Sequence, residues 1–405
     1  MSSLFSTVSQ FWSRVQGSLF PALDDAEIEM TPKLYRLVAV LDLLQIEQFV
    51  PWRAPSLKGA KPKDRRCLAR AFVAKNFYNM TDTKAWRDRL LHDKDLRKVC
   101  GWVFKSEVPS ESTFSRAFAW FADLGLADQV QAAQVQAWLG DEILRDVSTD
   151  STAIEAREHP VTRAKPPVDA ALEAPVASTS AAPPAAPEPL SSPTAASAKP
   201  ARPRKSKQGT KAQHLAAAYT PPEPTRLERQ LEQEPEFALL ELPTRCDVGC
   251  KTNSKGNKDY WIGYKFHVRV AAGNLPLVAV TTAASVHDSQ VAIPLMKLSD
   301  RQVTSLYELM DRGYDAKWIR RAAEEAGHVP IIDYVRRRGQ ERAQELAPDR
   351  AEHYKGRTVA ERFNARLKDE FGGNQVRVRG HRKVHAHLMF GLLVIFADQL
   401  LRTLA

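Results

Sequence analysis

Three acidic residues, Asp150, Asp311 and Glu361, stand where a metal-dependent reaction would need them. Asp150 closes a stretch of alternating, β-favouring residues, Asp311 closes another, and Glu361 lies midway along a pattern with helical spacing. Carboxylate oxygens suit Mg²⁺ and Mn²⁺, which need only a few of them when water and a phosphate complete the coordination shell. Two such ions could activate water or a 3′-hydroxyl and stabilise the leaving oxygen. These residues therefore predict phosphoryl transfer without a covalent protein nucleophile.

The neighbours of Glu361 strengthen this interpretation. Tyr354, Arg357, Glu361 and Lys368 occupy relative positions 0, 3, 7 and 14, which fall on one face of a helix. That face would offer a metal-binding carboxylate, two cations that clamp phosphates, and a phenol. A solvated stripe of charged residues fits the same spacing. Because the chain has 48 acidic residues, any one of the three acids taken alone is more often structural than catalytic.

The elements that carry these residues follow one another in an informative order. A strand at 144–155 is followed by a long insertion, then by two strands, a helix, a strand, a helix, a strand and a long helix. The later elements are expected at 260–271, 276–286, 287–300, 303–311, 315–327, 328–333 and 349–373. Three opening strands followed by alternating helices and strands predict an RNase H-like α/β core with a mixed sheet. Strands one and four are neighbours in that arrangement, so Asp150 and Asp311 should emerge together, with Glu361 across from them.

Residues 1–143 are expected to form a helical domain, because apolar residues recur at helical spacing along 34–50, 66–80 and 83–104. Ser110 is expected to cap a further helix. Short helices that begin with hydroxyl and arginine side chains can dock on DNA phosphates. A bundle that only packs or oligomerises fits the same pattern. We expect this domain to bind DNA ends.

Residues 158–245 interrupt the core. Most of this segment is rich in alanine, proline and serine, cannot bury enough apolar surface to fold, and is expected to be disordered. Arg202 and Arg204 flank a proline in it, and such an extended pair can lie in a narrow minor groove of DNA, although a solvated basic linker fits equally well. Its last part has the composition of a short helix. The first strand of the core is expected within 144–157, and the rest of the core within 246–405.

Composition limits the classes of function. The 405 residues include 58 lysines and arginines against 48 acids, and a formal charge of +10 attracts a polyanion such as nucleic acid. Four cysteines without an export signal favour a cytoplasmic location. Cys246 and Cys250 lack a second ligand pair at zinc spacing. The longest apolar run, 388–401, is short for a membrane span and contains Asp398, so we expect a buried helix and no membrane partner.

Several further polar residues lie near the proposed site in the sequence. Lys265 and His267 fall on an alternating strand, and Asp288 is expected only to cap a helix, so none of them is assigned a role. The tract RVRGHRKVHAH, residues 377–387, follows directly on the predicted catalytic helix. It could bind phosphate or form a solvated basic loop, and it is the second choice for DNA contact.

The motifs around the three acids resemble those of a known family. The segment YKGRTVAERFNARLK is similar to the Tyr-Arg-Glu-Lys signature of bacterial insertion-sequence transposases of the DDE class. DSTAIEA, which starts at Asp150, and MDRGYD, which contains Asp311, look like the flanks of that family's first two catalytic aspartates. NSKGNKDYWIGYKFHV with ASVHDSQVAIPLMKLSD resembles its hairpin and next helix, and VPSESTFSRAF resembles the end of its N-terminal domain. The resemblance covers most of the chain outside 160–245.

By this resemblance the three acids bind two Mg²⁺ ions, for which Mn²⁺ substitutes, and Tyr354, Arg357 and Lys368 contact the transposon-end strand. The implied activity is cleavage at the element's ends and joining of the freed 3′-hydroxyls to target DNA, by a homodimer on double-stranded DNA at the nucleoid. Some members insert a large β-domain between the second aspartate and the glutamate, but 361 − 311 = 50 residues leave no room for one here. A catalytically silent, transposase-derived DNA-binding protein and another RNase H-like nuclease remain alternatives.

Overall fold

The computed structural model describes residues 30–52, 63–160, 223–252, 256–336 and 344–404 of the chain. Its first part is helical, as predicted. The elements are α3 (Pro32–Leu44), η2 (Ile46–Phe49), α4 (Arg65–Phe77), α5 (Thr83–His92), α6 (Lys94–Val99), η3 (Lys105–Glu107), α7 (Glu111–Leu124) and α8 (Leu126–Leu139). The single pattern seen at 83–104 forms two helices, because Asp93 ends α5 and its carboxylate accepts a hydrogen bond from Leu96 N to start α6. Ser110 is the N-cap residue of α7, where it was expected.

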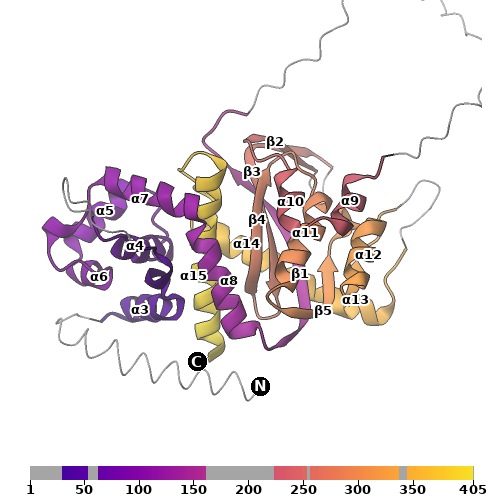
Figure 1. Cartoon of the computed structure of the whole chain (residues 1–405), viewed down its shortest axis with the longest axis horizontal. Coiled ribbons are helices and arrows are strands. Elements are labelled where there is room, and N and C mark those ends of the chain that lie inside the picture. Colours follow the sequence, from indigo (N-terminus) through magenta and orange to yellow (C-terminus); the bar gives the residue numbers. More distant parts are fainter. Residues whose placement is uncertain (1–29, 53–62, 161–222, 253–255, 337–343, 405) are drawn as a thin grey trace, which may run out of the picture. The chain divides into compact units, whose positions relative to one another are not determined.

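A six-stranded mixed sheet forms the rest of the core (Figure 1). Its strands are β1 (Ile143–Glu155), β2 (Asp247–Thr252), β3 (Lys258–Ala271), β4 (Leu275–Ala283), β5 (Thr304–Met310) and β6 (Val329–Ile332). β1 pairs antiparallel with β3 and parallel with β5, β5 pairs parallel with β6, and β4 pairs antiparallel with β3. This is the predicted RNase H-like arrangement with strands one and four side by side, in which β5 is the fourth strand predicted. The short β2, which pairs with the first half of β3, was not predicted.

β1 covers the range 144–155 in which the first strand was expected, and it runs past Asp150, where the alternating pattern ends. It continues to Glu155, because the long β3 stays paired with it from Asp150 opposite Val268 to Glu155 opposite Gly263. The pairing of β1 with β5 does stop one residue before Asp150. The polar residues after Asp150 therefore belong to a strand that has lost its neighbour on one side, and not to a turn.

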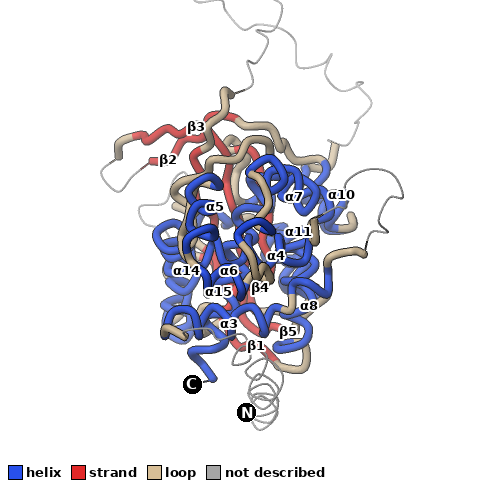
Figure 2. The backbone as a smooth tube through the Cα atoms, turned by 90° about the vertical axis from the view of Figure 1, so that its left-hand side faces the viewer, coloured by secondary structure: helices blue, strands red, loops and turns tan. Residues whose placement is uncertain are grey.

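Helices lie on both sides of the sheet. α11 (Ser289–Asp300) and α12 (Lys317–Glu325) cover one side, and α14 (Thr358–Glu370) packs on β1 and β3 from the other. Figure 2 shows the strands between α14 on one side and α10 and α11 on the other. The end of the insertion, where a short helix was expected, forms two helices, α9 (Arg226–Glu232) and α10 (Pro235–Leu240), which contact α11. Arg202 and Arg204 lie outside the described residues.

The long helix predicted at 349–373 is broken into α13 (Pro348–Tyr354), the 3₁₀ turn η5 (Lys355–Arg357) and α14. Two contacts draw the turn against the sheet. The Ser148 hydroxyl of β1 donates to the carbonyl oxygen of Arg357 at 3.0 Å. Gly356 approaches β5 so closely that an added Cβ would lie 3.1 Å from Leu309 Cδ1. The break thus follows from close packing on β1 and β5, which sequence periodicity does not report.

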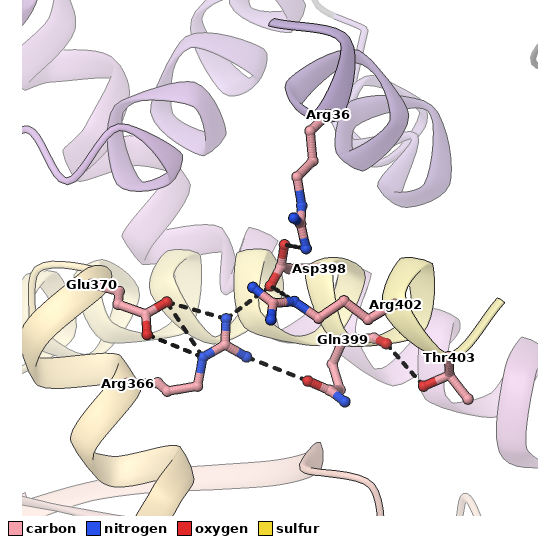
Figure 3. Close-up of polar contacts among 7 residues, drawn as sticks. All are labelled: Arg36, Arg366, Glu370, Asp398, Gln399, Arg402 and Thr403. Carbon is pink, nitrogen blue, oxygen red and sulfur yellow. Dashed lines mark hydrogen bonds and ion pairs between the residues drawn. The ribbon is translucent and has the colours of Figure 1, made fainter. Parts of the chain in front are cut away.

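The apolar run at 388–401 lies in α15 (His381–Leu404), which is buried against α3, α4, α7, α8 and β4. α15 is long and apolar enough to cross a membrane, but 89% of its apolar window is buried inside the protein, as expected for a core helix. Its one acid, Asp398, is buried and contacts Arg36 of α3 at 2.5 Å, Arg366 of α14 at 2.8 Å and Arg402 at 3.0 Å (Figure 3). This carboxylate therefore joins α3 of the helical region to α14.

Candidate active site

The sheet places Asp150 and Asp311 side by side. The last matched residues in the parallel pairing of β1 with β5 are Thr149 and Met310, and the residue that follows each of them in the chain is an aspartate. Neighbouring strands lie about 4.8 Å apart, so the two carboxylates start from adjacent backbone positions. The register of β1 and β5 therefore brings Asp150 and Asp311 together, as expected from the strand order.

Both aspartates are hard to ionise. Burial raises the pKa of Asp150 to about 6, and the nearby charge of Asp311 acts in the same direction. Burial also raises the pKa of Asp311, and the charge of Asp288 adds to that effect. The guanidinium of Arg357 opposes these changes at both residues. Two carboxylates that repel each other's charge are stabilised by a cation between them.

A tight turn fixes the Asp311 side chain. Its Oδ1 accepts a hydrogen bond of 2.8 Å from the backbone N–H of Gly313 and so caps the short turn η4 (Arg312–Tyr314). A Cβ on Gly313 would lie only 3.0 Å from that oxygen. Glycine at this position lets the carboxylate fold back onto its own backbone, which holds one oxygen and leaves the other for a ligand.

Glu361 does not join the aspartate pair in this structure. Its side chain is 50% exposed and accepts a hydrogen bond of 2.6 Å from Arg357, one helical turn earlier. Among the described residues, no group of three or more acidic, histidine or cysteine side chains is placed to hold one metal ion. The expected convergence of all three acids is therefore not seen, because the neighbouring guanidinium holds the glutamate.

Arg357 is the centre of the predicted signature. Its guanidinium lies 5.7 Å from the centroid of the Tyr354 ring and pairs with Glu361. Its charge also opposes the rise in the pKa of both aspartates. The structure thus brings Tyr354, Arg357 and Glu361 together beside the pair. Lys368 lies two turns further along α14, where burial, opposed by the charge of Glu155 but helped by that of Lys251, lowers its pKa. Its charged neighbours include Glu155 at the end of β1 and Lys251 of β2, so Lys368 does not belong to the cluster around Arg357.

Sequence reasoning missed Asn364. This buried residue follows Glu361 by three positions on α14, and its Nδ2 donates to Asp150 Oδ2 at 3.0 Å. Its Oδ1 has no hydrogen-bond partner among the described residues, although it is buried. Its spacing from Glu361 could have indicated this position, because residues three apart lie on one helix face. An uncharged asparagine, however, does not by itself indicate a metal or phosphate site.

A second polar group, on the opposite side of the sheet, supports the pair. Asp288, at the start of α11, accepts a hydrogen bond of 3.0 Å from Lys265 and another from the Ser151 hydroxyl. The Tyr314 hydroxyl is buried without a described partner, and this burial, together with the charges of Asp288, Asp150 and Asp311, raises its pKa. Asp288 was expected only to cap a helix, yet its charge also acts on Asp311.

The donor set fits a hard divalent cation. Mg²⁺ is usually held by one or two carboxylates, with water and phosphate oxygens completing its shell. Asp150 and Asp311 supply two carboxylates at adjacent positions, and Asn364 adds an amide oxygen without a described partner. Glu361 can contribute only after its ion pair with Arg357 opens.

Comparisons with known families match two parts of the chain. Residues 244–397 match the family described as Transposase DDE domain. Residues 23–120 match the family described as Transposase domain (DUF772). No curated protein and no solved structure matches the chain. The first match begins before β2 and ends within α15, and the second begins before α3 and ends within α7, so together they span most of both the helical region and the sheet.

Proposed function

Because the chain belongs to the transposases of the DDE class found in bacterial insertion sequences, we propose that it cuts DNA at the ends of such an element and joins the freed 3′-hydroxyls to target DNA. Asp150, Asp311 and Glu361 are the proposed catalytic residues. The observation that carries the proposal is the register that makes Asp150 and Asp311 neighbours, each with a raised pKa.

Mg²⁺ or Mn²⁺, held by the two aspartates, would supply activation of the attacking oxygen and stabilisation of the leaving oxygen. The protein's own groups prepare for this. Asn364 fixes one oxygen of Asp150, and the Gly313 N–H fixes one oxygen of Asp311. With both carboxylates pre-oriented, little reorganisation accompanies the reaction.

Arg357 and Glu361 would exchange partners when DNA arrives. A phosphate competes with Glu361 for the guanidinium, since arginine pairs with phosphate in the same bidentate manner as with carboxylate. Glu361 is then free to turn toward the aspartates, where it completes the triad. In this proposal the end strand lies on Tyr354, Arg357 and Lys368, and DNA contact and assembly of the catalytic acids are one event.

The test uses the full-length protein, Mg²⁺ or Mn²⁺, and a DNA library of candidate end sequences. Asp150→Asn, Asp311→Asn and Glu361→Gln should each abolish strand cleavage while DNA binding survives. Glu370→Gln is the matched control, because Glu370 is also 50% exposed on α14 and also pairs with an arginine four residues earlier. Metal-dependent cleavage that persists in the three variants would rule out the proposed site.

The proposed phosphate contacts have their own test. Arg357→Ala and Lys368→Ala should each weaken binding to cleaved ends and reduce the slope of binding against salt by about 1. Arg362→Ala, an exposed residue of the same helix that contacts Asn274, is the control. A salt slope that stays unchanged in both variants would refute the phosphate-contact roles.

Two ends must be cut together, so we propose a DNA-bound homodimer acting at the nucleoid in the cytoplasm. A catalytically silent DNA-binding descendant is the main alternative, and another RNase H-like nuclease is the second. The first predicts end binding without cleavage in the wild-type protein. The second predicts cleavage that does not depend on the element's end sequence.

A further inference from the structure

The short strand β2 and the facing part of β3 form a two-stranded ribbon at the end of the sheet. Pairing of β1 with β3 stops at Glu155 opposite Gly263, and β4 pairs with β3 only from residue 264 onward. Along residues 258–262, β2 is the only described strand that pairs with β3. We call residues 247–252 and 258–263 the ribbon, and Figure 2 shows it projecting from the sheet. It can therefore contact a molecule that lies against the end of the sheet, as two-stranded ribbons do in DNA grooves.

A glycine and a tryptophan fix the shape of the ribbon. Gly249 and Trp261 are direct cross-strand partners. A Cβ on Gly249 would lie 2.3 Å from Trp261 Cζ2, so the indole covers the glycine backbone and leaves no room for a side chain. The indole N–H also donates to the carbonyl oxygen of Tyr264 at 3.1 Å, and the backbone N–H of Ala156 donates to that of Ile262 at 3.0 Å. The base of the ribbon is therefore held firmly on the sheet.

The ribbon presents one cation on the same face as Trp261. Lys251 follows Gly249 by two residues, and alternate residues of a strand lie on one face. Lys251 is exposed, and in the described part of the chain no acidic group lies within ion-pair distance of its ammonium. A lysine ammonium carries three N–H donors. Lys251 can therefore bind an anion without first breaking an ion pair, unlike Arg357, which pairs with Glu361.

The charge of Lys251 reaches the candidate active site. Burial lowers the pKa of Lys368, and the charge of Lys251 lowers it further, although nearby acids act the other way. Burial raises the pKa of Asp311, and the charge of Lys251 opposes that rise. Because exposed charges are screened over roughly 10 Å, the Lys251 ammonium lies near both groups. Lys368 also forms no ion pair among the described residues, so two cations without ion-pair partners there lie at one edge of the site.

We propose that Lys251 and Lys368 bind one phosphate of the DNA strand that enters the candidate active site, so that the ribbon holds this strand against α14. This rests on the proposed function, which brings DNA to the aspartate pair. Lysine binds phosphate as a point charge without a fixed geometry, so ammoniums from two separate elements can share one group. A phosphate between them also offsets their mutual repulsion. Because phosphate contacts position a strand but carry no sequence information, the effect of Lys251 does not depend on the end sequence.

The first test measures the reactivity of individual lysines toward acetylation in the full-length protein. The protein is treated with and without a duplex of mixed sequence that ends in a single-stranded 3′ extension, in Ca²⁺, which takes oxygen ligands as Mg²⁺ does. Mass spectrometry gives the modified fraction at each lysine. DNA should reduce modification of Lys251 and Lys368 by at least about threefold, because both ammoniums are then bound to phosphate. Lys258 should keep its reactivity, because it lies opposite Thr252 on the other face of the ribbon.

The second test compares variants of the ribbon by the salt dependence of their binding to the same duplex, labelled with fluorescein. Lys251→Ala should reduce the slope of binding against salt by about 1, and Lys251→Arg should keep the slope of the wild type. Lys258→Ala is the matched control, because it removes the same charge from an exposed residue of the same ribbon. The proposal is overturned if Lys258→Ala lowers the slope as much as Lys251→Ala, or if DNA leaves Lys251 as reactive as Lys258.

Failure of this proposal and failure of the proposed function give different results. Asp150→Asn should show the same protection of Lys251 as the wild type, because it alters the aspartate pair and not the ribbon. Protection of Lys251 in a wild type that cuts no DNA in Mg²⁺ would retain the ribbon contact and remove the catalytic proposal. Cleavage of DNA while Lys251 stays fully reactive would do the reverse.

Discussion

Replacing Asp150 with asparagine should make the protein more stable while it removes cleavage. The native pKa of Asp150 is about 6, against an ordinary value of 3.8. Ionising this carboxylate is therefore harder in the folded chain than in the unfolded one. Its protonated form favours folding below pH 4, and that contribution is lost as the pH rises through 6. Above pH 6 the folded wild type carries a buried charge that asparagine would not have.

The size of the effect follows from the two pKa values. Their difference, 6 − 3.8, is about 2 pKa units, and each unit corresponds to 1.36 kcal/mol, so the charge costs about 3 kcal/mol at pH 8. An asparagine oxygen can still accept the hydrogen bond that Asn364 donates to Asp150. The variant should therefore keep the native contact and gain up to about 3 kcal/mol at pH 8, but almost nothing at pH 4.

Urea denaturation of both proteins in EDTA, at pH 4 and at pH 8, measures this difference in the free energy of unfolding. Asp123→Asn, the same chemical change at an exposed residue of α7, should shift it by less than about 0.5 kcal/mol. Added Mn²⁺ should raise the stability of the wild type more than that of Asp150→Asn, because it binds the native site. If Asp150→Asn is no more stable than the wild type at pH 8, the inferred free-energy cost of burying the Asp150 charge is refuted.

Three further outcomes test other parts of the structure. The affinity of the wild type for Mn²⁺, measured by electron paramagnetic resonance of the free ion, should fall as the pH drops through about 6, since protons then compete at Asp150; a flat profile would contradict this. Asp288→Asn should reduce competition by protons at the second carboxylate, Asp311, whose pKa is raised by burial and further by the charge of Asp288, so the loss of affinity below pH 6 should be shallower than in the wild type. Asp398→Asn should cost about 2 kcal/mol of unfolding free energy, because the buried carboxylate accepts charge-assisted hydrogen bonds from Arg366 and Arg402 that an amide replaces only in part, whereas Glu370→Gln, which removes an exposed partner of the same cluster, should cost less than about 1 kcal/mol.

Strand order was predictable because alternation and turn residues are local signals. The hairpin of β3 and β4 is an example, since Gly273 and Asn274 both adopt the positive φ that their sequence favours in a turn. The parallel pairing of β1 with β5 was predicted from the order of elements alone. Elements whose limits depend on tertiary partners were not predictable. β2 exists because β3 is long enough to pair with it, and the break before α14 exists because Ser148 and Leu309 hold the turn.

The insertion also has one part that its composition predicts and another that depends on tertiary partners. Its composition predicted disorder for most of its length and a short helix near its end, and residues 161–222 lie outside the described residues. The last part folds because it finds a partner. Gln230 of α9 donates to the carbonyl oxygen of Gln290 at 2.9 Å, and Lys297 of α11 donates to the carbonyl oxygens of Leu231 and Gln233. Neither short helix could be stable alone, so only the packed structure explains them.

The difference between the two aspartates and Glu361 has a physical origin. A strand register fixes backbone positions. Two residues that directly follow the last pair of one parallel ladder are therefore neighbours, whichever conformation their side chains adopt. A helix fixes only which face a side chain lies on, and a glutamate with three rotatable bonds can reach either inward or to a cation one turn away. Arg357 is that cation, and its guanidinium is also close enough to act on both aspartates. The sequence spacing that placed the arginine beside the glutamate therefore also explains why the glutamate turns away from the pair. We propose that the triad closes when a DNA phosphate, an anion with which arginine pairs as readily as with a carboxylate, binds the arginine instead.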